Sequence, residues 1–152
     1  MHYEIFGAIY TNKINHMNEL YIFYEEYKVE VLARLPFFLS ELVEPYTANE
    51  FYDFIEKHGG KKIYLGKHKS KLEISLEINL TESHYCRLCS LADSSGYIEI
   101  PNRWGIFSLL RKIAYENSIK NGMANDELIR VFGISQRTIS TARKKMAISK
   151  QS

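Results

Sequence analysis

The sequence predicts an α+β fold that is mainly α-helical with a small β component. Apolar residues recur at spacings of three and four along most of the chain, which is the period of one helical face. A few short segments instead alternate apolar and polar residues or follow a glycine turn, which is typical of strands. After Pro101 only the helical pattern remains. We therefore expect a helical and strand region over residues 1–100 and a separate helical domain over residues 101–152.

The composition is that of a folded protein whose charges are unevenly placed. Of its 152 residues, 45% are hydrophobic and 25% are charged, which is too apolar for an intrinsically disordered chain. The formal net charge of +2 does not by itself mark a nucleic-acid binder. Residues 136–152, however, contain no acidic residue and several basic ones, namely Arg137, Arg143, Lys144, Lys145 and Lys150. This end of the chain is the candidate surface for a polyanion.

Sequence signals for the cellular compartment all point to the cytoplasm. No segment approaches the roughly 18 consecutive apolar residues of a membrane span. The N-terminus lacks the basic and then apolar layout of a secretory signal. Cys86 and Cys89 would close too small a loop for a useful structural disulfide, so nothing indicates an oxidising compartment. We expect a cytoplasmic protein without a membrane partner.

The first half of the chain reads as three helices and a strand. Residues 15–35 carry apolar side chains at helical spacing until Pro36, and a short helix can follow as far as Pro45. Thr47 and Glu50 have the spacing of a capping box at the start of a third helix, which the glycines after His58 should end. The apolar residues 63–65 then predict a short strand.

The middle of the chain predicts a strand, a helix and another strand. Residues 72–80 alternate strictly between apolar and polar side chains, which favours a half-buried strand. A helix should begin after Thr81 and end in the turn-forming residues 93–96. Residues 97–100 read as a short strand closed by Pro101, and the helix that follows should break near Asn121 and Gly122.

The last two helices have the residue pattern of a helix-turn-helix, in which two helices pack at a steep angle across a tight turn. Gly133 permits the turn, and Ser135 is placed to cap the second helix. The apolar positions expected between the helices are all filled, by Leu128, Phe132, Ile134, Ile139 and Ala142. One residue departs from the commonest pattern, because the usually small position after Leu128 is Ile129.

The outward face of the second helix suits DNA. Gln136 and Arg137 are residue types that pair with adenine and guanine edges, and serine, threonine and lysine side chains can contact bases or phosphates. The candidate DNA-binding residues are Ser135, Gln136, Arg137, Ser140, Thr141, Arg143, Lys144 and Lys145. The alternative is a plain helical hairpin with a solvated basic tail. That alternative does not explain a face without carboxylates, since ordinary solvated helices mix both signs of charge.

Two stretches of the chain resemble the Mor transcription activator family, the middle-gene activators of Mu-like phages. Residues 54–65 are similar to the family's helix, Gly-Gly turn and strand, and residues 126–139 are similar to its helix-turn-helix. Ile98-Glu99-Ile100-Pro101 supplies the proline that follows the strand in the family. The chain departs from the family in having some thirty extra residues between the first glycine turn and the DNA-binding domain.

The resemblance implies a homodimer whose N-terminal helices and strands form a twofold interface and whose paired recognition helices meet an inverted repeat in double-stranded DNA. A dimer also doubles the few base contacts that one helix-turn-helix can make. The aromatic residues of the N-terminal helices could line that interface or pack in the core; they are Tyr21, Phe23, Tyr24, Tyr27, Phe37 and Phe38. RNA polymerase would be a further partner of an activator.

Two other clusters carry groups that could bind a ligand. Basic residues around the first glycine turn, Lys61, Lys62, Lys67 and Lys69, could make secondary phosphate contacts or belong to a solvated hairpin. His84, Cys86 and Cys89 could hold zinc only if His58 or His68 supplied a fourth ligand, so we expect no metal.

The function expected from the sequence is that of a phage-encoded or mobile-element-encoded transcriptional regulator. No Gly-rich phosphate loop, Ser/His/Asp order or paired-carboxylate signature is present, so we expect no enzyme activity and no cofactor. Two alternatives stay open. One is an accessory of a DNA-processing enzyme such as a recombinase or nuclease, and the other is a phage-encoded inhibitor that acts by binding a protein.

Overall fold

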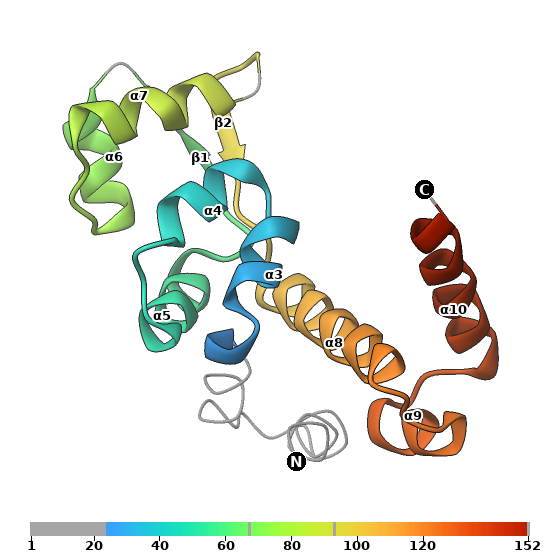
Figure 1. The fold of residues 1–152 in the computed structure, drawn as a ribbon. Helices are drawn as coiled ribbons and strands as arrows, with labels where there is room; N and C mark the ends of the chain where they lie inside the picture. The colour runs from blue at the N-terminus through green and yellow to red at the C-terminus, as the bar shows by residue number, and fades with distance from the viewer. Residues whose placement is uncertain (1–23, 67, 93, 152) are drawn as a thin grey trace. The chain divides into compact units, whose positions relative to one another are not determined.

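A computed structural model describes residues 24–66, 68–92 and 94–151, which fall into two compact units (Figure 1). One unit comprises residues 28–107, and the other comprises residues 24–27 together with residues from Ser108 onward. The structure is mostly helical with one two-stranded antiparallel sheet, so the predicted fold class is confirmed. None of the helices among the described residues is long and apolar enough to cross a membrane.

The larger unit begins with two short helices, α3 (Lys28–Arg34) and α4 (Phe37–Val43). Residues 24–26 are helical and Tyr27 forms a turn, so the helix expected over residues 15–35 is interrupted within its described part. The remainder of that expected helix, residues 15–23, lies outside the described residues. Pro36 separates α3 from α4 as predicted, with φ −53° and ψ 141°. Val31 and Leu35 are buried, as the predicted apolar face requires, and Leu39 of α4 is buried too.

Helix α5 (Ala48–His58) begins at the predicted capping box. The Thr47 hydroxyl accepts a hydrogen bond from the Glu50 amide at 3.2 Å, and the Glu50 carboxylate accepts one from the Thr47 amide at 3.2 Å. Gly59 ends the helix as predicted. A Cβ there would lie 2.5 Å from the Ile55 carbonyl oxygen, so only glycine fits this helix end.

The two predicted short strands, β1 (Lys62–Tyr64) and β2 (Tyr97–Glu99), pair with each other in antiparallel register, with Ile63 opposite Ile98. Hydrogen bonds from Gly60 to Ile100 and from Leu65 to Gly96 extend the ladder beyond the strands. Ile63 and Ile98 are buried on one face. On the exposed face the Tyr64 and Tyr97 rings meet at a tilt of 49°, with centroids 5.1 Å apart. The segment between the strands is therefore an insertion in a hairpin.

The prediction of a strand over residues 72–80 is wrong, because residues 69–76 form helix α6 (Lys69–Leu76). A pattern that alternates at every second position also repeats at every fourth, which is close to one helical turn. In α6 the residues four apart lie on the buried side of the helix. Leu72 and Leu76 are each only 1% exposed, whereas Ile74 between them is 79% exposed. In the described residues β1 and β2 pair only with each other, and residues 69–76 join neither edge of their sheet.

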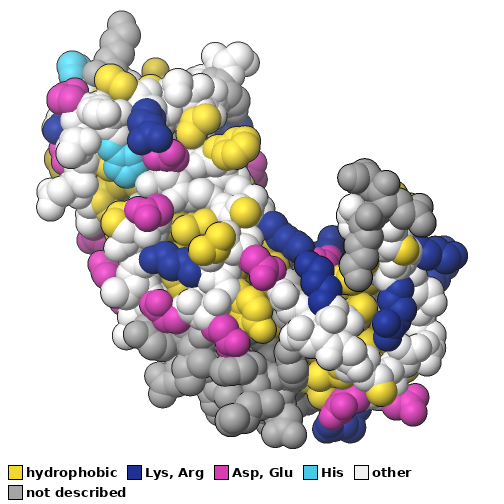
Figure 2. Space-filling model, viewed as in Figure 1, with side chains coloured by type: hydrophobic (Ala, Val, Ile, Leu, Met, Phe, Trp, Pro, Cys, Tyr) yellow, Lys and Arg dark blue, Asp and Glu magenta, His cyan; other side chains and the backbone are white. Residues whose placement is uncertain are grey.

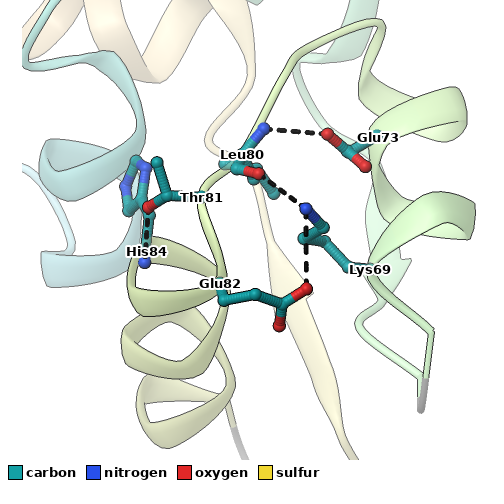
Figure 3. Close-up of polar contacts among 6 residues, drawn as sticks. All are labelled: Lys69, Glu73, Leu80, Thr81, Glu82 and His84. Atoms are coloured by element: carbon teal, nitrogen blue, oxygen red, sulfur yellow. Dashed lines mark hydrogen bonds and ion pairs between the residues drawn. The ribbon is translucent and has the colours of Figure 1, made fainter.

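The connection from α6 to α7 (Glu82–Leu91) is held by side chains rather than by a strand ladder (Figure 3). Glu73 accepts a hydrogen bond from the Leu80 amide at 2.9 Å, and the Lys69 ammonium donates to the Leu80 carbonyl at 2.9 Å. Thr81 caps α7 as predicted by accepting from the His84 amide at 3.1 Å.

Helix α7 is tied to the end of β1 by Tyr85. The Tyr85 hydroxyl is within hydrogen-bond distance of both the Leu65 and Gly66 carbonyl oxygens, at 3.2 and 2.7 Å. Burial and the neighbouring Cys89 raise the pKa of Tyr85 to about 12. The long helix α8 (Arg103–Lys120) then leads to α9 (Asn125–Phe132) and α10 (Gln136–Gln151), and the break predicted at Asn121 and Gly122 separates α8 from α9.

Candidate nucleic-acid interface

The turn between α9 and α10 has the geometry predicted from Gly133. This residue has φ 64° and ψ 27°, the left-handed conformation in which a side chain is strained, and its amide donates to the Ile129 carbonyl at 2.9 Å. Two residues later, the Ser135 hydroxyl accepts a hydrogen bond from the Thr138 amide at 3.1 Å. Ser135 therefore caps α10, which confirms the predicted helix start.

The side chains predicted to pack between the two helices are buried. Leu128 and Phe132 of α9 are fully buried, and the side chains that face them from the turn and from α10 are at most 8% exposed; these are Ile134, Ile139 and Ala142. Val131, which the sequence interpretation did not assign to this core, is also buried at 4% exposure. Ile129, the departure from the commonest pattern, is half-buried. We call this packed unit the α9–α10 pair.

Helix α8 holds the C-terminal end of α9 in a way that the sequence did not reveal. The Arg111 guanidinium donates two hydrogen bonds to the Phe132 carbonyl, from Nε at 3.2 Å and from Nη2 at 2.8 Å. The Tyr115 ring meets the Phe132 ring edge-on, with centroids 6.2 Å apart. A carbonyl at the end of a helix has no partner within that helix. Arg111 donates to this carbonyl and so ties α8 to the end of α9.

All eight candidate DNA-binding residues are exposed. They lie on α10, which continues to Gln151, and at its cap. Figure 2 shows lysine and arginine side chains gathered on the part of the surface that α10 forms. Within α10 no acidic residue offsets them. The exposed face of α10 is therefore cationic and rich in hydrogen-bonding groups.

These eight side chains differ in how firmly they are held. The Arg143 guanidinium donates to the Asn125 side-chain oxygen at 2.7 Å, and the Asn125 amide nitrogen donates to the Gln136 side-chain oxygen at 3.4 Å. The Thr141 hydroxyl donates to the Arg137 carbonyl at 2.9 Å. By contrast, no hydrogen bond or ion pair with another described residue holds the Arg137, Lys144 or Lys145 head groups. Asn125 was not predicted as part of the site.

The second basic cluster lies in the other unit and is divided by its contacts. Lys61 and Lys62 are exposed, and the Lys62 ammonium lies 5.3 Å from the centre of the Tyr97 ring. Lys69 is half-buried. Its ammonium donates to the Leu80 carbonyl and lies 3.6 Å from the Glu82 carboxylate, so these contacts within the unit hold it (Figure 3). Lys67 lies outside the described residues. Among the described members of the cluster, Lys61 and Lys62 are thus the exposed ones.

The three residues weighed as zinc ligands do not converge. His84 Nε2 lies 2.9 Å from the Glu41 carbonyl oxygen, whereas Cys86 is exposed and Cys89 is half-buried against Tyr85. His58 is buried beside the Phe54 ring, and that burial lowers its pKa. Across residues 24–66, 68–92 and 94–151, no three His, Cys, Asp or Glu side chains are grouped to hold a metal.

Comparison of the chain with known protein families, curated proteins and solved structures finds no match.

Proposed function

We propose that the protein is a transcriptional regulator that binds double-stranded DNA sequence-specifically, with α10 entering the major groove. The observation that carries this proposal is the exposed face of α10. This face combines cations with amide and hydroxyl groups and has no carboxylate. It belongs to the α9–α10 pair, whose second helix is capped and whose apolar side chains are buried. An α-helix fits the major groove of B-DNA, where each base pair presents a distinct pattern of donors and acceptors.

The site residues divide into two roles under this proposal. Gln136 and Arg137, at the start of α10, are the residues for base edges, because the N-terminal end of a recognition helix contacts the bases. Lys144 and Lys145 lie two to three turns further along and neutralise phosphates. Ser135, Ser140, Thr141 and Arg143 complete the contact surface. The free amides at the start of α10 also favour a phosphate.

The proposal includes a homodimer on an inverted repeat, as the resemblance to the Mor family implies. Two apolar side chains on the N-terminal helices support a contact face there, since Val29 is 82% exposed and Phe37 is 78% exposed. Tyr24, in contrast, is only 2% exposed and packs in its own chain. Tyr21 and Phe23 lie outside the described residues. A twofold pair would present two copies of α10 at a fixed half-site spacing.

Selection from a random library of double-stranded DNA tests the proposal. The full chain should enrich one inverted-repeat sequence, bind it in a gel shift, and lose affinity steeply as salt rises. Sedimentation should give about twice the chain mass on that duplex. Recovery of no sequence would contradict the proposal and favour a protein-binding inhibitor. Cleavage of the duplex on addition of Mg²⁺ would instead identify a DNA-processing enzyme.

A further inference from the structure

Asn125, the first residue of α9, is hydrogen-bonded to two side chains of the proposed DNA site, the cationic Arg143 and the amide of Gln136. Its side-chain oxygen accepts from Arg143 at 2.7 Å, and its side-chain nitrogen donates to Gln136 at 3.4 Å. These bonds span 18 and 11 residues of sequence and join the start of α9 to two successive regions of α10. Asn125 is itself exposed, so this chain of contacts lies at the surface that meets DNA.

The order of donors and acceptors along this chain follows from chemistry. A guanidinium can only donate, so the Asn125 atom that faces Arg143 must be its oxygen. The Asn125 nitrogen is then left to face Gln136. Because that nitrogen can only donate, the Gln136 atom that meets it must be the oxygen Oε1. Through Asn125, Arg143 thus favours the orientation of the Gln136 amide in which Oε1 faces Asn125.

The sense of that amide matters for base recognition. Adenine presents a donor, its N6 amino group, beside an acceptor, N7, and a glutamine reads this pair with its oxygen and nitrogen together. Guanine presents two acceptors, O6 and N7, and is read by donors. A glutamine whose amide can rotate by 180° can place its nitrogen opposite either of these two base atoms. A glutamine held in one sense discriminates more strongly.

We propose that Asn125 is a positioning residue that biases the orientation of the Gln136 amide and thereby favours adenine over guanine at the base that Gln136 contacts. This inference rests on the proposed DNA-binding function. A bond of 3.4 Å is longer than the usual N–H···O range of about 2.7 to 3.2 Å, so it biases the amide without locking it. One such bond changes a preference by about threefold to tenfold.

A purely structural role for Asn125 makes a different prediction. If Asn125 only joins α9 to α10, its loss lowers stability and weakens binding to every duplex alike. If it positions Gln136, its loss changes the ratio of affinities for adenine and guanine at one base pair. That change must also disappear when Gln136 is absent, because the effect passes through that side chain.

Asn125→Asp is the variant closest in size; it keeps an acceptor for Arg143 and replaces the donor to Gln136 with a carboxylate oxygen. The added negative charge weakens binding to every duplex alike, so the readout is the ratio of affinities and not the affinity itself. The probes are two duplexes of the selected sequence that carry A·T or G·C at the position where Gln136→Ala relaxes selectivity. Wild type should prefer adenine there. Asn125→Asp should reduce the adenine-to-guanine affinity ratio about threefold to tenfold, whatever it does to overall affinity. In the Gln136→Ala background the same substitution should leave the ratio unchanged.

Arg143→Leu provides a second route, because it frees the Asn125 amide to turn over and should lower the same ratio even if Asn125→Asp fails to fold. An unchanged ratio in the folded variants would overturn the inference while leaving DNA binding intact. A wild-type preference for a base other than adenine would overturn it too, as would a Gln136→Ala variant that relaxes no position. If wild type selects no duplex at all, the proposed function and this inference fail together.

Discussion

Replacing Arg111 tests how the α9–α10 pair is held in place. In Arg111→Ala both hydrogen bonds to the Phe132 carbonyl, at 3.2 and 2.8 Å, are lost. A hydrogen bond from a charged donor contributes about 1.5 to 3 kcal/mol to stability. Arg111 is half-buried, and both bonds share one acceptor, so we take the lower end and expect a loss of about 1.5 kcal/mol in the free energy of unfolding.

For a chain of this size a loss of about 1.5 kcal/mol lowers the melting temperature by about 3 to 6 °C. Lys112→Ala is the control, because Lys112 is the exposed neighbour on the same helix and its replacement should stay within about 0.5 kcal/mol of wild type. Arg111→Lys should fall between the two, since lysine keeps the charge but not the planar fork of donors. Calorimetry or thermal circular dichroism measures all three. Equal melting temperatures for Arg111→Ala and Lys112→Ala would refute this account of how α9 is fixed.

The remaining predictions concern the turn, the division of roles on α10, and Tyr85. Gly133→Ala should cost about 1 to 2 kcal/mol from left-handed strain, and Gly122→Ala, at φ 84° with open space around its Cβ position, should cost a similar amount. At a temperature where both variants are folded, only the Gly133 variant should also bind DNA more weakly than wild type. Equal DNA affinity of the two variants would show that the α9–α10 turn is not needed for recognition. Arg137→Ala should cost about 1 to 3 kcal/mol on the selected duplex and relax one base position. Lys145→Ala should weaken all sequences alike and reduce the salt slope by about one, and a base-specific loss there would reverse the assigned roles. Because the folded pKa of Tyr85 is raised to about 12, its ionisation favours unfolding. This contribution to stability is present below pH 10 and is lost as the pH rises through about 12. Tyr85→Phe lacks the hydroxyl and its hydrogen bonds, so it should have a lower free energy of unfolding at neutral pH than wild type. That free energy should also fall less steeply above pH 10, as chemical denaturation at several pH values would show.

The elements that sequence predicted well are those whose signals are local. The Thr47 capping box, the glycine at the α9–α10 turn and the Ser135 cap each depend on residues within a few positions of one another. Such contacts follow from the chain's own geometry, so the spacing of residue types is enough to find them. The apolar seam between α9 and α10 was found for the same reason, since it repeats at helical spacing.

The elements that sequence missed depend on contacts between distant segments. Residues 72–80 satisfy both a strand pattern and a helical repeat of four, and the helix buries Leu72 and Leu76 together against the rest of the chain. Arg111 and Asn125 act across helices, on groups 21 and up to 18 residues away. No local spacing marks them. Lys69 was misjudged in the same way, because its partner carbonyl at Leu80 becomes its neighbour only after α6 forms.

The most direct test of the central claim replaces Gln136, Arg137, Thr141 and Lys144 together by alanine. All four side chains are exposed, so the variant should fold, with a far-ultraviolet circular dichroism spectrum like that of wild type. Binding of wild type and variant to the selected duplex is then measured by fluorescence anisotropy across a series of salt concentrations. We predict that the variant loses the preference for the selected sequence and retains only weak, salt-sensitive binding. Unchanged affinity and sequence preference in a folded variant would show that α10 does not read DNA.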